Sequence, residues 1–167
     1  MSASAFDGFL EQLSNMPFAL AISGGAYWFP ILETVHVLAI ALVVGTIAIV
    51  DLRLLGVAAH RGSADRLIAE LLPYTWVAFV LAVIAGALLF ASNAPTYAHN
   101  LAFQLKAGLI VLAGLNMAAF HLTTYRRIAH WDEAQSPPTA ARVAGATSLC
   151  LWVVVVFLGR WVGFTLT

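Results

Sequence analysis

Charged residues and cysteines are scarce in this sequence. Only 10% of the 167 residues are charged, 62% are hydrophobic, and eight basic residues balance eight acidic ones. About a quarter of a soluble domain is normally charged, so this composition excludes an ordinary soluble protein and indicates an integral membrane protein. The zero net charge, with no basic tract, argues against nucleic-acid binding. Cys150 is the only cysteine, which excludes an internal disulfide framework and a multi-thiolate metal site within one chain.

The N-terminal segment lacks basic residues, because no lysine or arginine precedes Arg53. A secretory signal peptide needs a basic region before its apolar core, so we expect this segment to be retained. The apolar residues Phe6, Phe9, Leu10 and Leu13 recur here at helical spacing, and polar residues occupy the opposite face. This pattern predicts an amphipathic helix over about residues 4–22 that lies on the membrane surface.

Long apolar runs follow, at about residues 28–52, 71–91, 101–123 and 143–164. A helix needs roughly 20 apolar residues to cross the hydrocarbon core, so each run is long enough for one span. We therefore expect an all-α fold, an integral membrane four-helix bundle with an N-terminal interfacial helix. The connections are short, so residues 1–167 are expected to form a single membrane domain whose first partner is the lipid bilayer.

The basic residues indicate which side of the membrane each connection occupies. Most of them lie in or beside the connections after the first and third runs: Arg53, Arg61, Arg66, Arg126, Arg127 and Arg142. Because cytoplasmic loops are enriched in lysine and arginine, we expect both connections in the cytoplasm. Both termini, and the connection over residues 92–100, then lie on the outer side.

Ionisable residues interrupt the apolar runs. Glu33, His36 and Asp51 lie in or at the end of the first run, and Lys106 and His121 lie in the third. A charged side chain at membrane depth costs roughly 2.5 to 3.5 kcal/mol, so these groups need partners, a cofactor or a path for water. They are therefore the residues on which a functional-site hypothesis rests.

Helical geometry sorts these groups into two layers. The ionisable side chains of the first run share one face of their helix, within an arc of about 60°. In the third run His99, Lys106 and His121 also lie within about 60° of one another, and Asn116 lies to the side of them. The rise along each helix separates an outer level from an inner one. The first polar layer, nearer the outer side, consists of Glu33, His36 and Lys106. The second polar layer consists of Asp51, Arg53 and His121.

The two layers have several interpretations. Ion pairs would neutralise the charges and fix the register of the helices. The candidate pairs are Glu33 with Lys106, and Asp51 with His121 or Arg53. A proton relay through the same groups and Asn116 is a second interpretation. A haem site and a quinone or substrate site are the others, since imidazole serves both as an axial ligand and as a titrating relay.

A haem held by two histidines needs two imidazoles at one depth on facing helices. The candidate ligands are His36, His121, His99 and His60, with His36 and His121 placed first as ligands of the haem iron. His99 lies about 10 Å outside the first polar layer, and His60 about 13 Å inside the second. Pairing His36 with His99, or His121 with His60, therefore requires offset helices or bent helix ends.

Short motifs are distributed over nearly the whole chain. They include Glu33-Thr34-Val35-His36, Asp51-Leu52-Arg53-Leu54-Leu55-Gly56, Leu72-Pro73-Tyr74-Thr75-Trp76, Phe103-Gln104-Leu105-Lys106 and Gly159-Arg160. Together they resemble those of an uncharacterised family of small bacterial four-span membrane proteins. The resemblance implies a multi-pass protein of the bacterial inner membrane, which together with the basic residues makes both termini periplasmic. It implies no activity, so whether the protein is an enzyme stays open.

A more distant similarity is to HemJ-type protoporphyrinogen oxidases and to the membrane part of CopD-type copper-resistance proteins. These have a first-span histidine followed by an arginine, and a third-span lysine followed by a histidine. His36, Arg53, Lys106 and His121 occupy these places. The similarity implies binding of haem b or a related tetrapyrrole. Leu52 replaces the proline that precedes the arginine in the HemJ type, so the oxidase activity is not carried over.

The function expected from the sequence is a haem b-binding, electron-transferring protein of the inner membrane, with quinone as a further candidate ligand. Its candidate partners are a redox protein, quinone and a second copy of the chain. One alternative is a proton-coupled carrier or proton relay that uses both polar layers and Asn116. Another is a structural membrane subunit of a larger redox complex.

Overall fold

The structure is a computed structural model, and it describes residues 2–57, 64–127 and 137–165. Within these ranges the chain is helical, with no strand. The expected all-α fold is confirmed. His60 and Arg61 lie outside the described residues, as does the side chain of Arg127.

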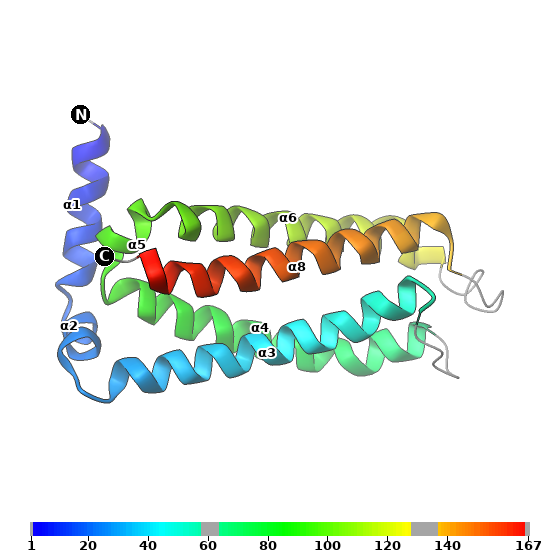
Figure 1. Cartoon of the computed structure of the whole chain (residues 1–167), viewed down its shortest axis with the longest axis horizontal. Coiled ribbons are helices and arrows are strands. Elements are labelled where there is room, and N and C mark those ends of the chain that lie inside the picture. The colour runs from blue at the N-terminus through cyan, green and yellow to red at the C-terminus, as the bar shows by residue number, and fades with distance from the viewer. Residues whose placement is uncertain (1, 58–63, 128–136, 166–167) are drawn as a thin grey trace.

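Four long helices form the bundle: α3 (Trp28–Leu54), α4 (Ala64–Ala91), α6 (Leu101–Thr123) and α8 (Thr139–Thr165). They run lengthwise beside one another (Figure 1). Each is long and apolar enough to cross a membrane, since even the 23 residues of α6 rise about 35 Å against a hydrocarbon core of about 30 Å. Their outward faces carry exposed large apolar side chains such as Leu38, Val77, Val111 and Val153. This is a multi-pass membrane protein whose apolar helices contact lipid.

Small residues allow the spanning helices to pack closely, as is usual where lipid removes the hydrophobic drive for helix association. Most of the buried side chains in the spans are alanines, among them Ala39, Ala78 and Ala113. Gly145 of α8 lies directly on α3, because a Cβ at this residue would be 3.0 Å from the carbonyl oxygen of Asp51. Helix α3 packs against α4 and α8, and α6 packs against α8.

Three short helices gather at the end of the bundle where both termini lie (Figure 1): α1 (Ser2–Ser14), α2 (Pro17–Gly24) and α5 (Ala94–His99). Helix α1 runs across the axis of the bundle, as an interfacial helix does. The single amphipathic helix expected over residues 4–22 is divided, because Met16 is extended and Pro17 starts α2. Proline lacks an N–H group, so it fits the first turn of a new helix better than the interior of a continuous one.

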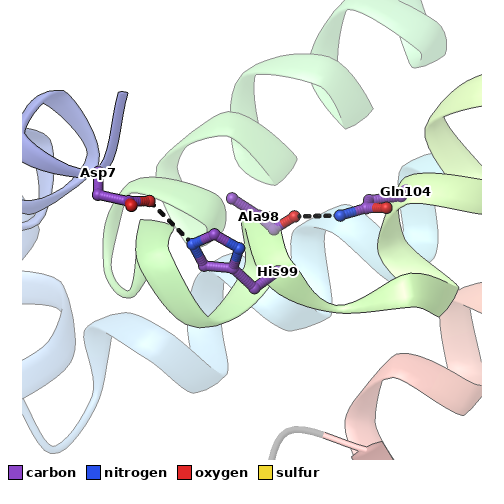
Figure 2. Close-up of polar contacts among 4 residues, drawn as sticks. All are labelled: Asp7, Ala98, His99 and Gln104. Atoms are coloured by element: carbon purple, nitrogen blue, oxygen red, sulfur yellow. Dashed lines mark hydrogen bonds and ion pairs between the residues drawn. The ribbon is translucent and has the colours of Figure 1, made fainter. Parts of the chain in front are cut away.

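Helix α1 is attached to α5 by two polar contacts. The backbone N–H of Ala94 donates a hydrogen bond to Ser14 Oγ at 2.8 Å, and His99 Nε2 lies 3.0 Å from Asp7 Oδ1. Figure 2 shows the imidazole of His99 directed at α1, with Gln104 bonded to the carbonyl of Ala98 at the start of α6. These contacts hold the short helices over the end of the bundle.

Candidate functional site

His36 of α3 is bonded to the backbone of the neighbouring helix α4. Its Nδ1 lies 2.8 Å from the carbonyl oxygen of Ala82. A carbonyl oxygen only accepts hydrogen bonds, so Nδ1 is the donor and carries a proton. In the neutral imidazole this leaves the lone pair of Nε2 available. Histidines that bind metals use this arrangement, in which the second ring nitrogen donates to a carbonyl or a carboxylate.

Gly86 makes room for this imidazole. A Cβ built on Gly86 would lie 2.8 Å from Cε1 of His36, closer than real Cβ atoms approach, and 3.2 Å from its Nδ1. The ring therefore rests against the bare backbone of α4, one turn beyond its acceptor at Ala82. The sequence predicts close helix approach at Gly86, and here the group that approaches is the side chain of a candidate ligand.

The charged members of the first polar layer surround His36 at longer range. Glu33 and Lys106 both act on it electrostatically. Glu33 also lies near Tyr97 of α5, whose pKa is raised chiefly by burial and secondly by the charge of Glu33. Among the described residues no ion pair joins Glu33 to Lys106. The amine of Lys106 instead lies 5.2 Å from the ring centre of Phe103, a cation–π contact.

A cavity of about 280 Å³ lies between the four spanning helices around the second polar layer. Its walls are mostly apolar and include aromatic side chains: Trp76, Phe79, Phe120 and Trp152. Polar side chains from all four helices also line it: Asp51, Thr75, Asn116, His121 and Ser148. The structure thus brings together Asp51, Asn116 and His121, which the sequence singled out separately. Arg53 lies in the last turn of α3 and does not line the cavity.

Asp51 is the most deeply buried ionisable group of the cavity, with 4% of its surface exposed. The hydroxyl of Ser148 is hydrogen-bonded to its carboxyl group, yet Oδ2 has no hydrogen-bond partner among the described residues. Buried polar atoms nearly always have a partner, so Oδ2 points to a bound molecule or water. Asn116 donates to the carbonyl of Ala144 at 3.0 Å, which ties α6 to α8 beside it.

His121 has the same hydrogen-bonded arrangement as His36, but within its own helix. Its Nδ1 lies 2.9 Å from the carbonyl oxygen of Met117. His121 lies twenty residues after the start of α6, or about 30 Å along it, whereas His36 lies eight residues after the start of α3, or about 12 Å. Both helices start at the same end of the bundle (Figure 1), so the two imidazoles cannot ligate one iron atom.

Ser148 and Thr75 are cavity residues that the sequence analysis did not single out. Thr75 donates a hydrogen bond to Thr46 Oγ1 at 2.8 Å, which joins α4 to α3 at the edge of the cavity. Ser148 lies three residues after Gly145 and so shares the face of α8 that packs on α3. The signal that could have predicted Ser148 as a site residue was a serine three residues after a glycine within an apolar run.

No group of three or more histidine, cysteine, aspartate or glutamate residues forms a metal cluster in the described ranges.

Comparison with known proteins places the chain in a family without giving it an activity. No curated protein and no solved structure matches it. Residues 13–165, nearly the whole chain, match one family. The four apolar helices agree with the small four-span family that the sequence motifs resemble. The protein belongs to the Family of unknown function (DUF6644).

Proposed function

We propose that the protein binds haem b in the bacterial inner membrane and transfers electrons, with His36 as the residue that would hold the haem iron. The observation that carries this proposal is the contact of His36 Nδ1 with the carbonyl of Ala82, which leaves Nε2 free to bind a metal. The bare backbone of Gly86 lies against the ring and leaves room for it. A neutral imidazole held in this way at membrane depth is suited to bind haem iron.

The donor set around His36 fits haem. Haem carries carboxylate groups as well as iron, and Lys106 is a cation of the same layer that forms no ion pair with Glu33. Lys106 would hold a carboxylate while His36 held the iron. Neither His121, which is too deep, nor His99, which faces Asp7, would share that iron. Bound haem supplies one-electron redox chemistry, and the protein supplies ligation and orientation.

The pattern shared with HemJ-type and CopD-type proteins also supports this proposal. His36, Arg53, Lys106 and His121 occupy the places of their span histidines, arginine and lysine. The positive-inside rule favours a cytoplasmic position for the end of the bundle opposite α1, with the termini and the first polar layer toward the periplasm. A redox partner protein would exchange electrons with the haem from that side.

The absorption spectrum of the purified protein, expressed with ample haem, tests the proposal. Wild-type protein should show a Soret band that shifts on reduction with dithionite. His36→Ala should lose most of the bound haem, whereas His99→Ala, in which the altered imidazole faces α1, should keep it. Haem-free wild-type protein, or full haem content in His36→Ala, would overturn the proposal.

A second candidate function is a proton relay. It is favoured by Asp51, whose buried Oδ2 has no described hydrogen-bond partner in a cavity that His121 also lines. In vesicles that contain a pH-sensitive dye, proton flux through the wild-type protein should then fall in Asp51→Asn. If wild-type protein shows neither haem nor flux, the remaining interpretation is a structural subunit of a redox complex.

A further inference from the structure

The cavity around Asp51 is a binding site in its own right. All four spanning helices line it, and His36 is not among its residues. An inference about this cavity therefore does not depend on haem binding. Its volume of about 280 Å³ is close to the lower end of the range for small-molecule sites, about 300 to 1,000 Å³. A single ring-shaped group fills such a space.

The charge of the lining excludes several ligand classes. Among the residues that the structure describes, no lysine or arginine lines the cavity, so an anion would find no counter-charge. Asp51 is the only carboxylate among the described residues of its lining, and hard metal cations need several oxygen ligands. These features favour a neutral molecule, most of whose surface is apolar.

The hydrogen-bonding groups of the cavity specify the head group. Asp51 Oδ2 accepts when ionised and donates when protonated, and the free ring nitrogen of His121 can do either with its protonation state. Such groups suit a ligand whose oxygens change between carbonyl and hydroxyl. Trp76 and Trp152, from α4 and α8, supply flat apolar surfaces against which a ring can pack.

Helices α4 and α6 are the least closely packed neighbours around the cavity. Helices α4 and α6 both line it, yet no Cα atom of one lies within 8 Å of a Cα atom of the other along these two described helices. The other neighbouring pairs of spanning helices do pack at that distance. Side chains still join the two helices outside the cavity, where the rings of Phe90 and Phe103 stack with 5.3 Å between their centres.

We propose that this cavity binds the head group of a membrane quinone, with Asp51 and His121 bonded to its oxygens. The oxygen that faces Asp51 supplies the missing partner of Oδ2. The ring packs against the tryptophans.

Tryptophan fluorescence tests this directly, because quinones quench nearby indoles. Haem-free protein in lipid nanodiscs is titrated with a short-chain ubiquinone analogue. The wild-type protein should show saturable quenching, and the double variant Trp76→Phe/Trp152→Phe should lose the saturable part. Its remaining tryptophans report only quinone dissolved in the lipid.

Two glycines of α6 provide a matched pair of variants. A Cβ on either Gly114 or Gly108 would meet no atom within 4 Å, so α6 should tolerate leucine at both positions. Gly114 lines the cavity and Gly108 does not. Gly114→Leu should fill the cavity and weaken quinone binding at least about tenfold, while Gly108→Leu should bind like wild type. Saturating quinone should also raise the melting temperature of wild-type protein and of Gly108→Leu but not of Gly114→Leu.

Asp51 is tested separately by Asp51→Leu, which removes the hydrogen bond and should weaken binding about tenfold. Glu70→Gln, on the exposed part of α4, is its control. Equal quenching in Gly114→Leu and Gly108→Leu, or only linear quenching in wild type, would overturn the proposal and leave water as the occupant. The Soret band should be the same in both glycine variants, so failure of the haem proposal can be distinguished from failure of this one.

Discussion

The imidazole of His36 and the backbone of Gly86 are in direct contact across α3 and α4. A methyl group at residue 86 would stand 2.8 Å from Cε1 of the ring, so the ring could not keep its position. The contact connects packing to the proposed chemistry, because the same position gives Nδ1 its acceptor at Ala82.

Gly86→Ala should therefore displace His36 and break its bond to Ala82. We expect a loss of about 1 to 3 kcal/mol in the free energy of unfolding, together with a weakened haem spectrum. Gly45→Ala is the control, since a Cβ there meets nothing within 4 Å. Denaturant unfolding in a mild detergent measures the stability of the two variants, and their absorption spectra measure bound haem. Equal stability and equal spectra in the two variants would show that His36 does not depend on Gly86.

The contact between α8 and α3 gives a second prediction. In Gly145→Ala the new methyl group would lie 3.0 Å from the carbonyl oxygen of Asp51, a backbone atom that cannot turn aside. The helices should separate slightly, with a loss of about 1 to 3 kcal/mol. Gly163→Ala, on the same helix with open space around it, should be neutral or slightly stabilising. A neutral Gly145→Ala would mean that α8 and α3 pack less closely than the structure has them.

Hydrophobic run length was enough to predict the four spanning helices, because lipid permits few other structures for such segments. It was less informative about helix ends. Helix α4 starts at Ala64 and has Pro73 inside it, although the apolar run starts only near residue 71. Proline removes the hydrogen bond to the carbonyl of Ala69, a loss that membrane helices tolerate where neighbouring groups compensate. Sequence alone does not show which neighbours those are.

The candidate site was predictable in depth but not in detail. The helical rise places Asp51 and His121 at one level, and both line the cavity. The partner of His36 could not be predicted, because it is the backbone carbonyl of Ala82, and every residue of α4 offers a carbonyl. The partner of Asp51 is Ser148, from a helix whose rotation about its own axis is set only by packing.

The attachment of α1 to α5 should depend more on Ser14 than on Asp7. Ser14→Ala would leave the N–H of Ala94, a fully buried residue, without its acceptor, at a cost of about 1 to 3 kcal/mol. Asp7→Asn should cost at most about 1 kcal/mol, because the contact with His99 is solvent-exposed. Hydrogen exchange of the α1 amides measures how far α1 detaches from α5 in each variant. Faster exchange in Asp7→Asn than in Ser14→Ala would reverse the assignment.

Cysteine labelling tests the orientation in the membrane. The exposed residues Val57 and Thr96 lie at opposite ends of the bundle and can each be replaced by cysteine in a Cys150→Ala background. In cells whose outer membrane is permeabilised and whose inner membrane is intact, a maleimide that cannot cross the inner membrane should label Thr96→Cys. It should label Val57→Cys only after the cells are lysed. The opposite pattern would invert the topology.

The central claim is that Nε2 of His36 binds haem iron, and chemical rescue tests it most directly. His36→Gly should lose the haem spectrum and leave a space of imidazole size beside Gly86. Free imidazole, added at millimolar concentration during haem loading, should restore a Soret band close to that of wild type, and it should do so less well in His36→Gly/Gly86→Ala, where the methyl group occupies part of that space. A wild-type spectrum in His36→Gly without imidazole, or no haem in the wild-type protein itself, would contradict the account.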